Sequence, residues 1–183
     1  MKSILIVGAG GFIGGFIAAE ALRRGFDTYV AVRESTSRRY LSDPRLHFVV
    51  LDYDDPLAMS GALAEAAPQG KPWDYIIYNL GATKCANFAD FNRINFGYLR
   101  NFVGVIAENG LIPPGRFLFM SSLSALGPGD EKGYTPISPD MTPHPATGYQ
   151  KSRPRHTLRL TPKSRGPYSA RRVSTARTKK TIS

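Results

Sequence analysis

The feature that most constrains the fold is a glycine-rich turn close to the N-terminus. An apolar run over residues 3–7 precedes Gly8, Gly11 and Gly14. An alanine-rich segment over residues 12–24 follows them. This pattern predicts a strand, a glycine turn and a helix, in that order. One glycine allows a sharp turn, one allows a ligand to approach the backbone, and one allows the helix to pack closely against the strand.

The spacing of these glycines points to a dinucleotide pyrophosphate as the ligand. A helix N-terminus attracts negative charge through its free N–H groups and its dipole. We therefore assign the pyrophosphate site to the three glycines and to Phe12 and Ile13, the first helical residues. The spacing is G-x-x-G-x-x-G, and it differs from the dehydrogenase pattern G-x-G-x-x-G because position 13 is isoleucine. A tight turn without a ligand is the alternative, which the flanking strand and helix disfavour.

Apolar segments alternate with helix-like segments along the rest of the chain. Short apolar, β-branched runs predict strands, and a helical apolar stripe predicts a helix. The further strands are expected over residues 28–32, 46–51, 75–80 and 117–120, and the further helices from Pro56 and over residues 88–108. This alternation predicts an α/β fold with a doubly wound, parallel, Rossmann-type sheet. Ligands of such sheets bind at the carboxyl ends of the strands.

The end of the second expected strand favours NADP(H) as the cofactor. Arg33 stands where an acidic residue would bond the adenosine ribose 2′-hydroxyl, and an arginine there accommodates a 2′-phosphate. Glu34 keeps NAD(H) open as the other cofactor. A solvated basic loop over residues 33–39 is the alternative without a ligand.

The ends of the third and fourth strands supply further cofactor residues. Asp52 and Tyr53 follow the third strand, where a carboxylate and a ring would lie beside the adenine. Leu80, Gly81 and Ala82 follow the fourth strand, and the small residues among them would let a cofactor lie close. Because these strand ends meet at one edge of a parallel sheet, they support the cofactor site independently of the glycine turn.

The net charge of +10 is distributed unevenly along the chain. Residues 1–150 contain 13 Lys and Arg and 14 Asp and Glu, whereas residues 151–183 contain 11 Lys and Arg and no acidic residue. Because residues 1–150 are close to neutral, they lack the excess of basic residues that binding to nucleic acid requires. If nucleic acid binds at all, we expect only the basic tail to contact it.

Cysteine content and hydropathy indicate the compartment. Cys85 is the only cysteine, so no disulfide can form within the chain, which suits a reducing compartment. No apolar run of about 18 residues is present, and the N-terminus has no signal-peptide pattern. We expect a cytoplasmic protein without membrane contact and without a metal site.

Five features occur together in the first part of the chain. They are G-x-x-G-x-x-G at 8–14, Asn79-Leu80-Gly81-Ala82 after the fourth strand, Asn95 in the helix over residues 88–108, Ser121-Ser122 leading to Gly127, and Tyr149. In these features the chain resembles the extended short-chain dehydrogenase/reductase family, the NAD(P)-dependent epimerases and dehydratases of nucleotide sugars. The resemblance covers residues 1 to about 152.

The resemblance implies roles for individual residues. Tyr149 would exchange a proton with the substrate hydroxyl or carbonyl, Ser122 would hydrogen-bond the reacting oxygen, and Asn95 would belong to the cofactor site. The family places a lysine four residues after the tyrosine to lower the phenol pKa, but position 153 is arginine. The alternative is that Ser122 ends a strand and Tyr149 lies in a surface loop, both without chemistry. The resemblance also implies a small-molecule substrate and allows a homodimer for the complete family fold.

The resemblance ends after residue 152. Pro154 would break the helix that the family continues there, and few strongly apolar residues follow. We therefore expect an incomplete NAD(P)-binding Rossmann domain over residues 1–152, with the C-terminal part of the fold missing, and a basic, disordered tail over residues 153–183. The sudden loss of acidic residues suggests a truncated or frameshifted reading frame. A genuine basic tail that binds polyanions is the alternative.

Three functions remain open from the sequence. The first is an NAD(P)-dependent oxidoreductase of the epimerase/dehydratase type, which acts on a nucleotide sugar or a related hydroxyl or carbonyl compound and is inactive as the chain stands. The second is an NADP(H)-binding module without catalysis. The third is an NADPH-dependent carbonyl reductase.

Overall fold

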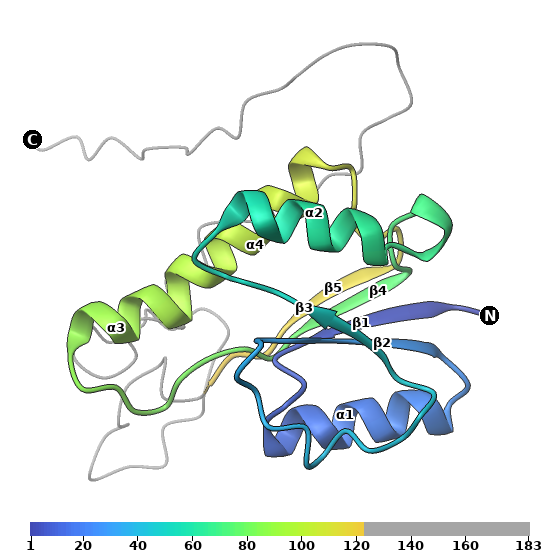
Figure 1. Cartoon of the computed structure of the whole chain (residues 1–183), viewed down its shortest axis with the longest axis horizontal. Helices are drawn as coiled ribbons and strands as arrows, with labels where there is room; N and C mark the ends of the chain where they lie inside the picture. The colour runs from blue at the N-terminus through green and yellow to red at the C-terminus, as the bar shows by residue number, and fades with distance from the viewer. Residues whose placement is uncertain (123–183) are drawn as a thin grey trace, which may run out of the picture.

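A parallel five-stranded sheet forms the centre of the molecule (Figure 1). The computed structural model describes residues 1–122, so Tyr149 and the expected tail over residues 153–183 lie outside the described residues. The strands are β1 (Ser3–Val7), β2 (Asp27–Val32), β3 (His47–Val50), β4 (Tyr75–Tyr78) and β5 (Arg116–Phe119). Their order in the sheet is β3-β2-β1-β4-β5, and every neighbouring pair is parallel. The predicted parallel α/β sheet is confirmed.

Helices cover both faces of this sheet. On one face lies α1 (Phe12–Arg23), and on the other lie α2 (Pro56–Ala66) and α4 (Tyr98–Glu108) (Figure 1). The shorter helical segments are η1 (Pro68–Gly70), α3 (Phe88–Asn92) and the π-helical η2 (Arg93–Gly97). The doubly wound arrangement is confirmed. Within residues 1–122, no helix has the length and apolar character needed to cross a membrane.

The central strand β1 is buried along its whole length. Its alternate residues face opposite sides of the sheet, as the pleat of a strand requires. Leu5 and Val7 belong to the core beneath α2 and α4, whereas Ile4 and Ile6 belong to the core beneath α1. A strand covered on both faces has a continuous apolar sequence, which explains the run that precedes the glycine turn.

The helix predicted over residues 88–108 contains a π-helical turn. The structure divides it into α3, η2 and α4. A π turn adds a residue to one turn and rotates the side chains that follow it, and such turns occur frequently at functional sites. In this protein the turn carries Asn95, which is buried and faces the loop after β4.

Candidate functional site

The carboxyl ends of the five strands lie at one edge of the sheet, and the predicted site residues follow them. The glycine turn follows β1, Arg33 follows β2, and Asp52 follows β3. Leu80 and Ser122 follow β4 and β5. The strand order places the glycine turn at the middle of this edge, between the loops after β2 and β4.

Gly8 makes the sharp turn that the sequence requires. Its φ of 78° lies in the left-handed region, which residues with a Cβ rarely adopt. A Cβ at Gly8 would also lie 2.7 Å from the backbone N and Cα of Leu80. The turn after β1 therefore contacts the loop after β4, and only glycine allows both the conformation and this contact.

Gly11 leaves the N-terminus of α1 open. It is the N-cap of the helix, no side chain caps it, and the first turn contains no acidic residue. A Cβ at Gly11 would have only the carbonyl oxygen of Gly8 nearby, at 4.0 Å. The residues Phe12 and Ile13 are 62% and 55% exposed. This end of the helix therefore has the space and the polarity to receive a phosphate group.

Gly14 has a packing role, and Gly15 shares it. A Cβ at Gly14 would lie 2.6 Å from the Cα of Ala9, so α1 packs directly on the turn. A Cβ at Gly15 would lie 2.6 Å from the Cβ of Tyr40 in the loop between β2 and β3. The sequence analysis missed the role of Gly15, because its partner is distant in sequence.

Arg33 begins the loop after β2 and is exposed. Its backbone N–H donates to Thr36 Oγ1 at 3.1 Å, and the N–H of Thr36 donates to the Arg33 carbonyl at 2.9 Å. In the part of the chain that the structure describes, the Arg33 guanidinium makes no ion pair. The positive charge at the end of β2 therefore remains available to an anion.

Tyr53 corrects one expectation. Its ring is 2% exposed and packs in the core beneath α2 and α4, stacked on Tyr98 with ring centroids 5.4 Å apart. Burial raises the pKa of the Tyr53 phenol. In the turn after β3, Asp52 is exposed whereas Tyr53 is buried, so the two side chains lie on opposite sides of the chain. The Tyr53 ring is therefore too buried to lie beside an adenine, and Asp52 is the remaining candidate at this strand end.

Asn95 anchors the loop that follows β4. It is 2% exposed, and both polar atoms of its side chain are paired with Ala82. Oδ1 accepts from the Ala82 N–H at 2.9 Å, and Nδ2 donates to the Ala82 carbonyl at 3.0 Å. Asn95 therefore holds the loop of Leu80, Gly81 and Ala82, and its predicted place in the cofactor site stays a prediction.

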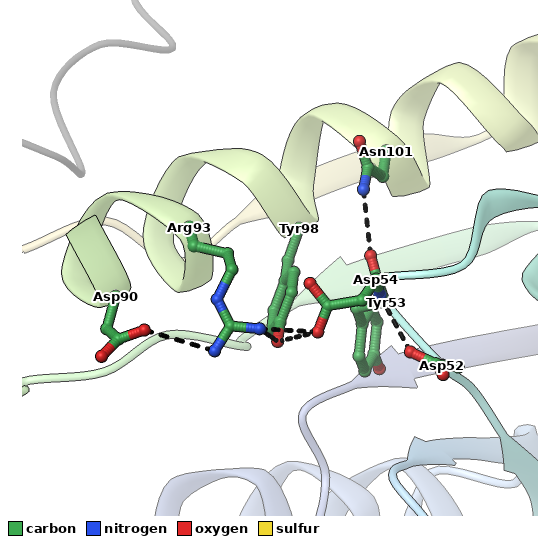
Figure 2. A network of polar contacts seen from close by, with 7 residues as sticks. All are labelled: Asp52, Tyr53, Asp54, Asp90, Arg93, Tyr98 and Asn101. Carbon is green, nitrogen blue, oxygen red and sulfur yellow. Dashed lines mark hydrogen bonds and ion pairs between the residues drawn. The ribbon is translucent and has the colours of Figure 1, made fainter.

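A polar network beside Asp52 was not predicted from the sequence (Figure 2). Arg93 Nη1 lies 2.8 Å from Asp54 Oδ2, and the Tyr98 hydroxyl donates to the same oxygen at 2.7 Å. Arg93 Nη2 also lies 3.4 Å from Asp90 Oδ1. The hydrogen bond and charge of Asp54 raise the pKa of Arg93, and desolvation together with Asp54 raises the pKa of Tyr98. Arg93 and Asp54 are 39 positions apart, so no local sequence pattern indicates their contact.

The two predicted catalytic residues cannot be compared in the structure. Ser122 is exposed and lies beyond the end of β5, at the same edge as the glycine turn. Tyr149 lies outside the described residues. Among the 122 residues from Met1 to Ser122, no group of His, Cys, Asp and Glu is arranged to hold a metal ion.

Comparison with protein families covers residues beyond those that the structure describes. The model of the NAD dependent epimerase/dehydratase family matches residues 4–154. No curated protein matches the chain. The family match includes every residue predicted for the cofactor site and both residues predicted for catalysis.

Solved structures with the same fold include proteins crystallised with NAD. WbmH of Bordetella bronchiseptica in complex with NAD+ has 25% identity and a TM-score of 0.65, with 84% of this chain and 49% of that chain covered. UDP-glucose 4-epimerase of Thermus thermophilus in complex with NAD has 20% identity and a TM-score of 0.69, with 85% and 49% covered. WbmG of B. bronchiseptica in complex with NAD and UDP has 21% identity and a TM-score of 0.64, with 82% and 46% covered. The chain therefore spans about half the length of these proteins.

Proposed function

The chain belongs to the NAD dependent epimerase/dehydratase family, and we propose that the edge of its sheet binds NADP(H) for chemistry on a nucleotide sugar. The observation that carries this proposal is the open N-terminus of α1 at Gly11. Free N–H groups and the helix dipole favour a pyrophosphate at such an end. The loops after β2, β3 and β4 lie at the same edge and would hold the rest of the cofactor.

Arg33 supports NADP(H) over NAD(H) in this proposal. Its exposed guanidinium follows β2, where the fold binds the adenosine ribose, and a 2′-phosphate would pair with it. NAD(H) is the alternative cofactor, since WbmH and the T. thermophilus epimerase were crystallised with NAD+ and NAD. Asp52 would accept a hydrogen bond at the adenosine end, and Leu80, Gly81 and Ala82 would line the path toward the nicotinamide.

A nucleotide sugar is the substrate class that the comparisons favour. One similar structure is named a UDP-glucose 4-epimerase, and the WbmG structure contains UDP. A cofactor bound at this edge would supply hydride transfer. We propose that Ser122 hydrogen-bonds the reacting oxygen of the sugar and that Tyr149 moves a proton at that oxygen. The Tyr149 phenol needs a nearby cation to act at neutral pH, because its unperturbed pKa is about 10.

A cofactor-binding module without catalysis is the second candidate, and residues 153 and 154 favour it. Arg153 stands where the family has a lysine, and a planar guanidinium does not replace an ammonium at a shaped site. Pro154 would interrupt a helix that carries this position. We therefore expect weak or no turnover by the chain as it stands. An NADPH-dependent carbonyl reductase is the remaining alternative and shares the same cofactor site.

Once cofactor binding has been measured, turnover distinguishes the two enzyme candidates from the binding module. The full chain would be incubated with NADP+ or NAD+ and a panel of UDP-sugars, with NMR detection of epimers and absorbance detection of reduced cofactor. NADPH with simple carbonyl compounds would test the reductase. Turnover that is lost in Ser122→Ala would support an enzyme, and cofactor binding without turnover would support the module. Absence of cofactor binding would contradict all three candidates.

A further inference from the structure

The carboxylate of Asp54 is held by two side chains from the helical segment after β4. Arg93 Nη1 lies 2.8 Å from Asp54 Oδ2, and the Tyr98 hydroxyl donates to this oxygen at 2.7 Å (Figure 2). The same Arg93 nitrogen lies 3.2 Å from the Tyr98 hydroxyl. The three groups therefore form a closed triangle, which fixes the position of Asp54 better than a single ion pair would.

The backbone of Asp54 in turn orients Asp52. The N–H of Asp54 donates to Asp52 Oδ1 at 2.9 Å, which makes a local turn directly after β3. The side chain of Asp52 is exposed, and no group among residues 1–122 pairs with its Oδ2. One carboxylate oxygen is thus fixed by the turn, and the other is presented at the sheet edge, where it can accept hydrogen bonds from an adenine amino group.

The segment that carries Arg93 also anchors two neighbouring loops. Asn95 lies in the same π-helical turn as Arg93 and holds Ala82 after β4. Asn101, one turn into α4, donates from Nδ2 to the Tyr53 carbonyl at 3.0 Å. One helical segment therefore ties the loop after β3 to the loop after β4, on the two sides of the edge where the cofactor is proposed to bind.

We infer that Arg93 is a positioning residue for the adenosine half of the cofactor, acting through Asp54 on the Asp52 carboxylate. The inference rests on the proposed cofactor site and extends it to a residue that would not itself contact the ligand. Stability alone does not account for the pair, because the side chains of Arg93 and Asp54 are about half exposed. Exposed pairs contribute little to the stability of a fold.

A double-mutant cycle on ligand affinity tests the inference. The full chain and the variants Arg93→Gln, Asp52→Asn and Arg93→Gln/Asp52→Asn would be titrated by calorimetry with 5′-AMP and with NADP+. We expect Arg93→Gln to lower the affinity for both ligands by about three- to tenfold. In the Asp52→Asn variant the same substitution should lower the affinity almost no further, because the effects of coupled residues are not additive. Tyr98→Phe removes only the hydroxyl and keeps the stacked ring, so it should weaken both ligands in the same direction.

The control is Arg23→Gln, which removes the exposed pair between Arg23 and Glu20 at the other end of α1. It should leave both affinities unchanged. Unchanged affinity in Arg93→Gln, or an equal loss with and without the Asp52→Asn substitution, would overturn the inference while the cofactor site stands. Failure of the unmodified chain to bind either ligand would instead overturn the proposed function on which the inference rests.

Discussion

Asn95 satisfies both backbone groups of Ala82, with its Oδ1 2.9 Å from the Ala82 nitrogen and its Nδ2 3.0 Å from the Ala82 oxygen. The π-helical turn that carries Asn95 thereby fixes the loop after β4. Ala82 lies beyond the end of β4, where no neighbouring strand pairs with it, and the buried Asn95 amide supplies both of its backbone hydrogen bonds.

We predict that Asn95→Ala lowers the free energy of unfolding by about 1–3 kcal/mol, because it leaves the N–H and carbonyl of Ala82 without partners. Urea unfolding can be followed by the fluorescence of Trp73, the single tryptophan, which is fully buried. Ser60→Ala is the control, since Ser60 makes one exposed hydrogen bond with Asn109. Equal stability of Asn95→Ala and the unmodified chain would show that the pairing is dispensable.

Gly14 and Gly61 lie inside helices but in opposite environments. A Cβ at Gly14 would lie 2.6 Å from the Cα of Ala9, whereas a Cβ at Gly61 in α2 would have nothing within 4 Å. We predict that Gly14→Ala destabilises the fold by about 1–3 kcal/mol through overpacking. Gly61→Ala should stabilise it by roughly 0.5–1 kcal/mol, since alanine loses less entropy in a helix. The same urea titration measures the free energy of unfolding of both variants. If both substitutions raised it, or both lowered it, the packing role of Gly14 would be contradicted.

The carboxyl group of Asp74 makes the free energy of unfolding depend on pH in the acid range. Its carboxylate accepts the backbone N–H of Ser3 at 2.7 Å and the Ser3 hydroxyl at 3.1 Å, and the backbone hydrogen bond from Ser3 is the main reason that the pKa of Asp74 is lowered from 3.8. A lowered pKa stabilises the folded state above pH 3.8, and this contribution disappears as the pH falls through the folded-state pKa.

We predict that Asp74→Ala loses about 1–2 kcal/mol of stability at neutral pH and that the difference from the unmodified chain shrinks in acid. Urea unfolding at neutral pH and at a series of pH values below about 4 provides the comparison. A difference that stays constant or grows as the pH falls would show that the Asp74 carboxylate is not stabilised in the folded state.

The parts of the fold that could be predicted depend on neighbours in sequence. The turn at Gly8 follows a buried strand directly, and the alternation of apolar runs and helical stripes is local, so the parallel sheet could be inferred. Gly11 and Gly14 likewise have roles that depend on the turn and on α1 alone. Residues at strand ends could be assigned to one edge because parallel topology brings those ends together.

The parts that could not be predicted depend on contacts between distant segments. Tyr53 turns inward because the core beneath α2 and α4 has room for its ring, which composition at a strand end does not indicate. Arg93 meets Asp54 only because the π-helical turn faces the loop after β3. Gly15 is small because Tyr40 packs on it from another loop. Each of these depends on tertiary packing.

Arg33 should distinguish the two cofactors. We predict that Arg33→Ala weakens NADP+ by about tenfold or more, because a charged partner of a phosphate contributes roughly 1.5–3 kcal/mol. NAD+, which lacks the 2′-phosphate, should be affected much less. Calorimetric titration of both cofactors measures the ratio. Equal losses for NADP+ and NAD+, or no loss, would show that Arg33 does not contact the 2′-phosphate.

The central claim is that the open N-terminus of α1 binds the pyrophosphate of the cofactor, and Gly11→Val tests it most directly. Gly11 has φ −79° and ψ 168°, an extended conformation that valine adopts readily, and a Cβ there meets only one atom, at 4.0 Å. The variant should therefore fold, with its Trp73 fluorescence and circular dichroism unchanged, while its side chain occupies the phosphate position.

Titration of the unmodified chain and of Gly11→Val with NADP+ and NAD+ is the measurement. We predict binding by the unmodified chain and a loss of about tenfold or more for both cofactors in the variant. Unchanged affinity in a folded Gly11→Val protein would contradict the claim.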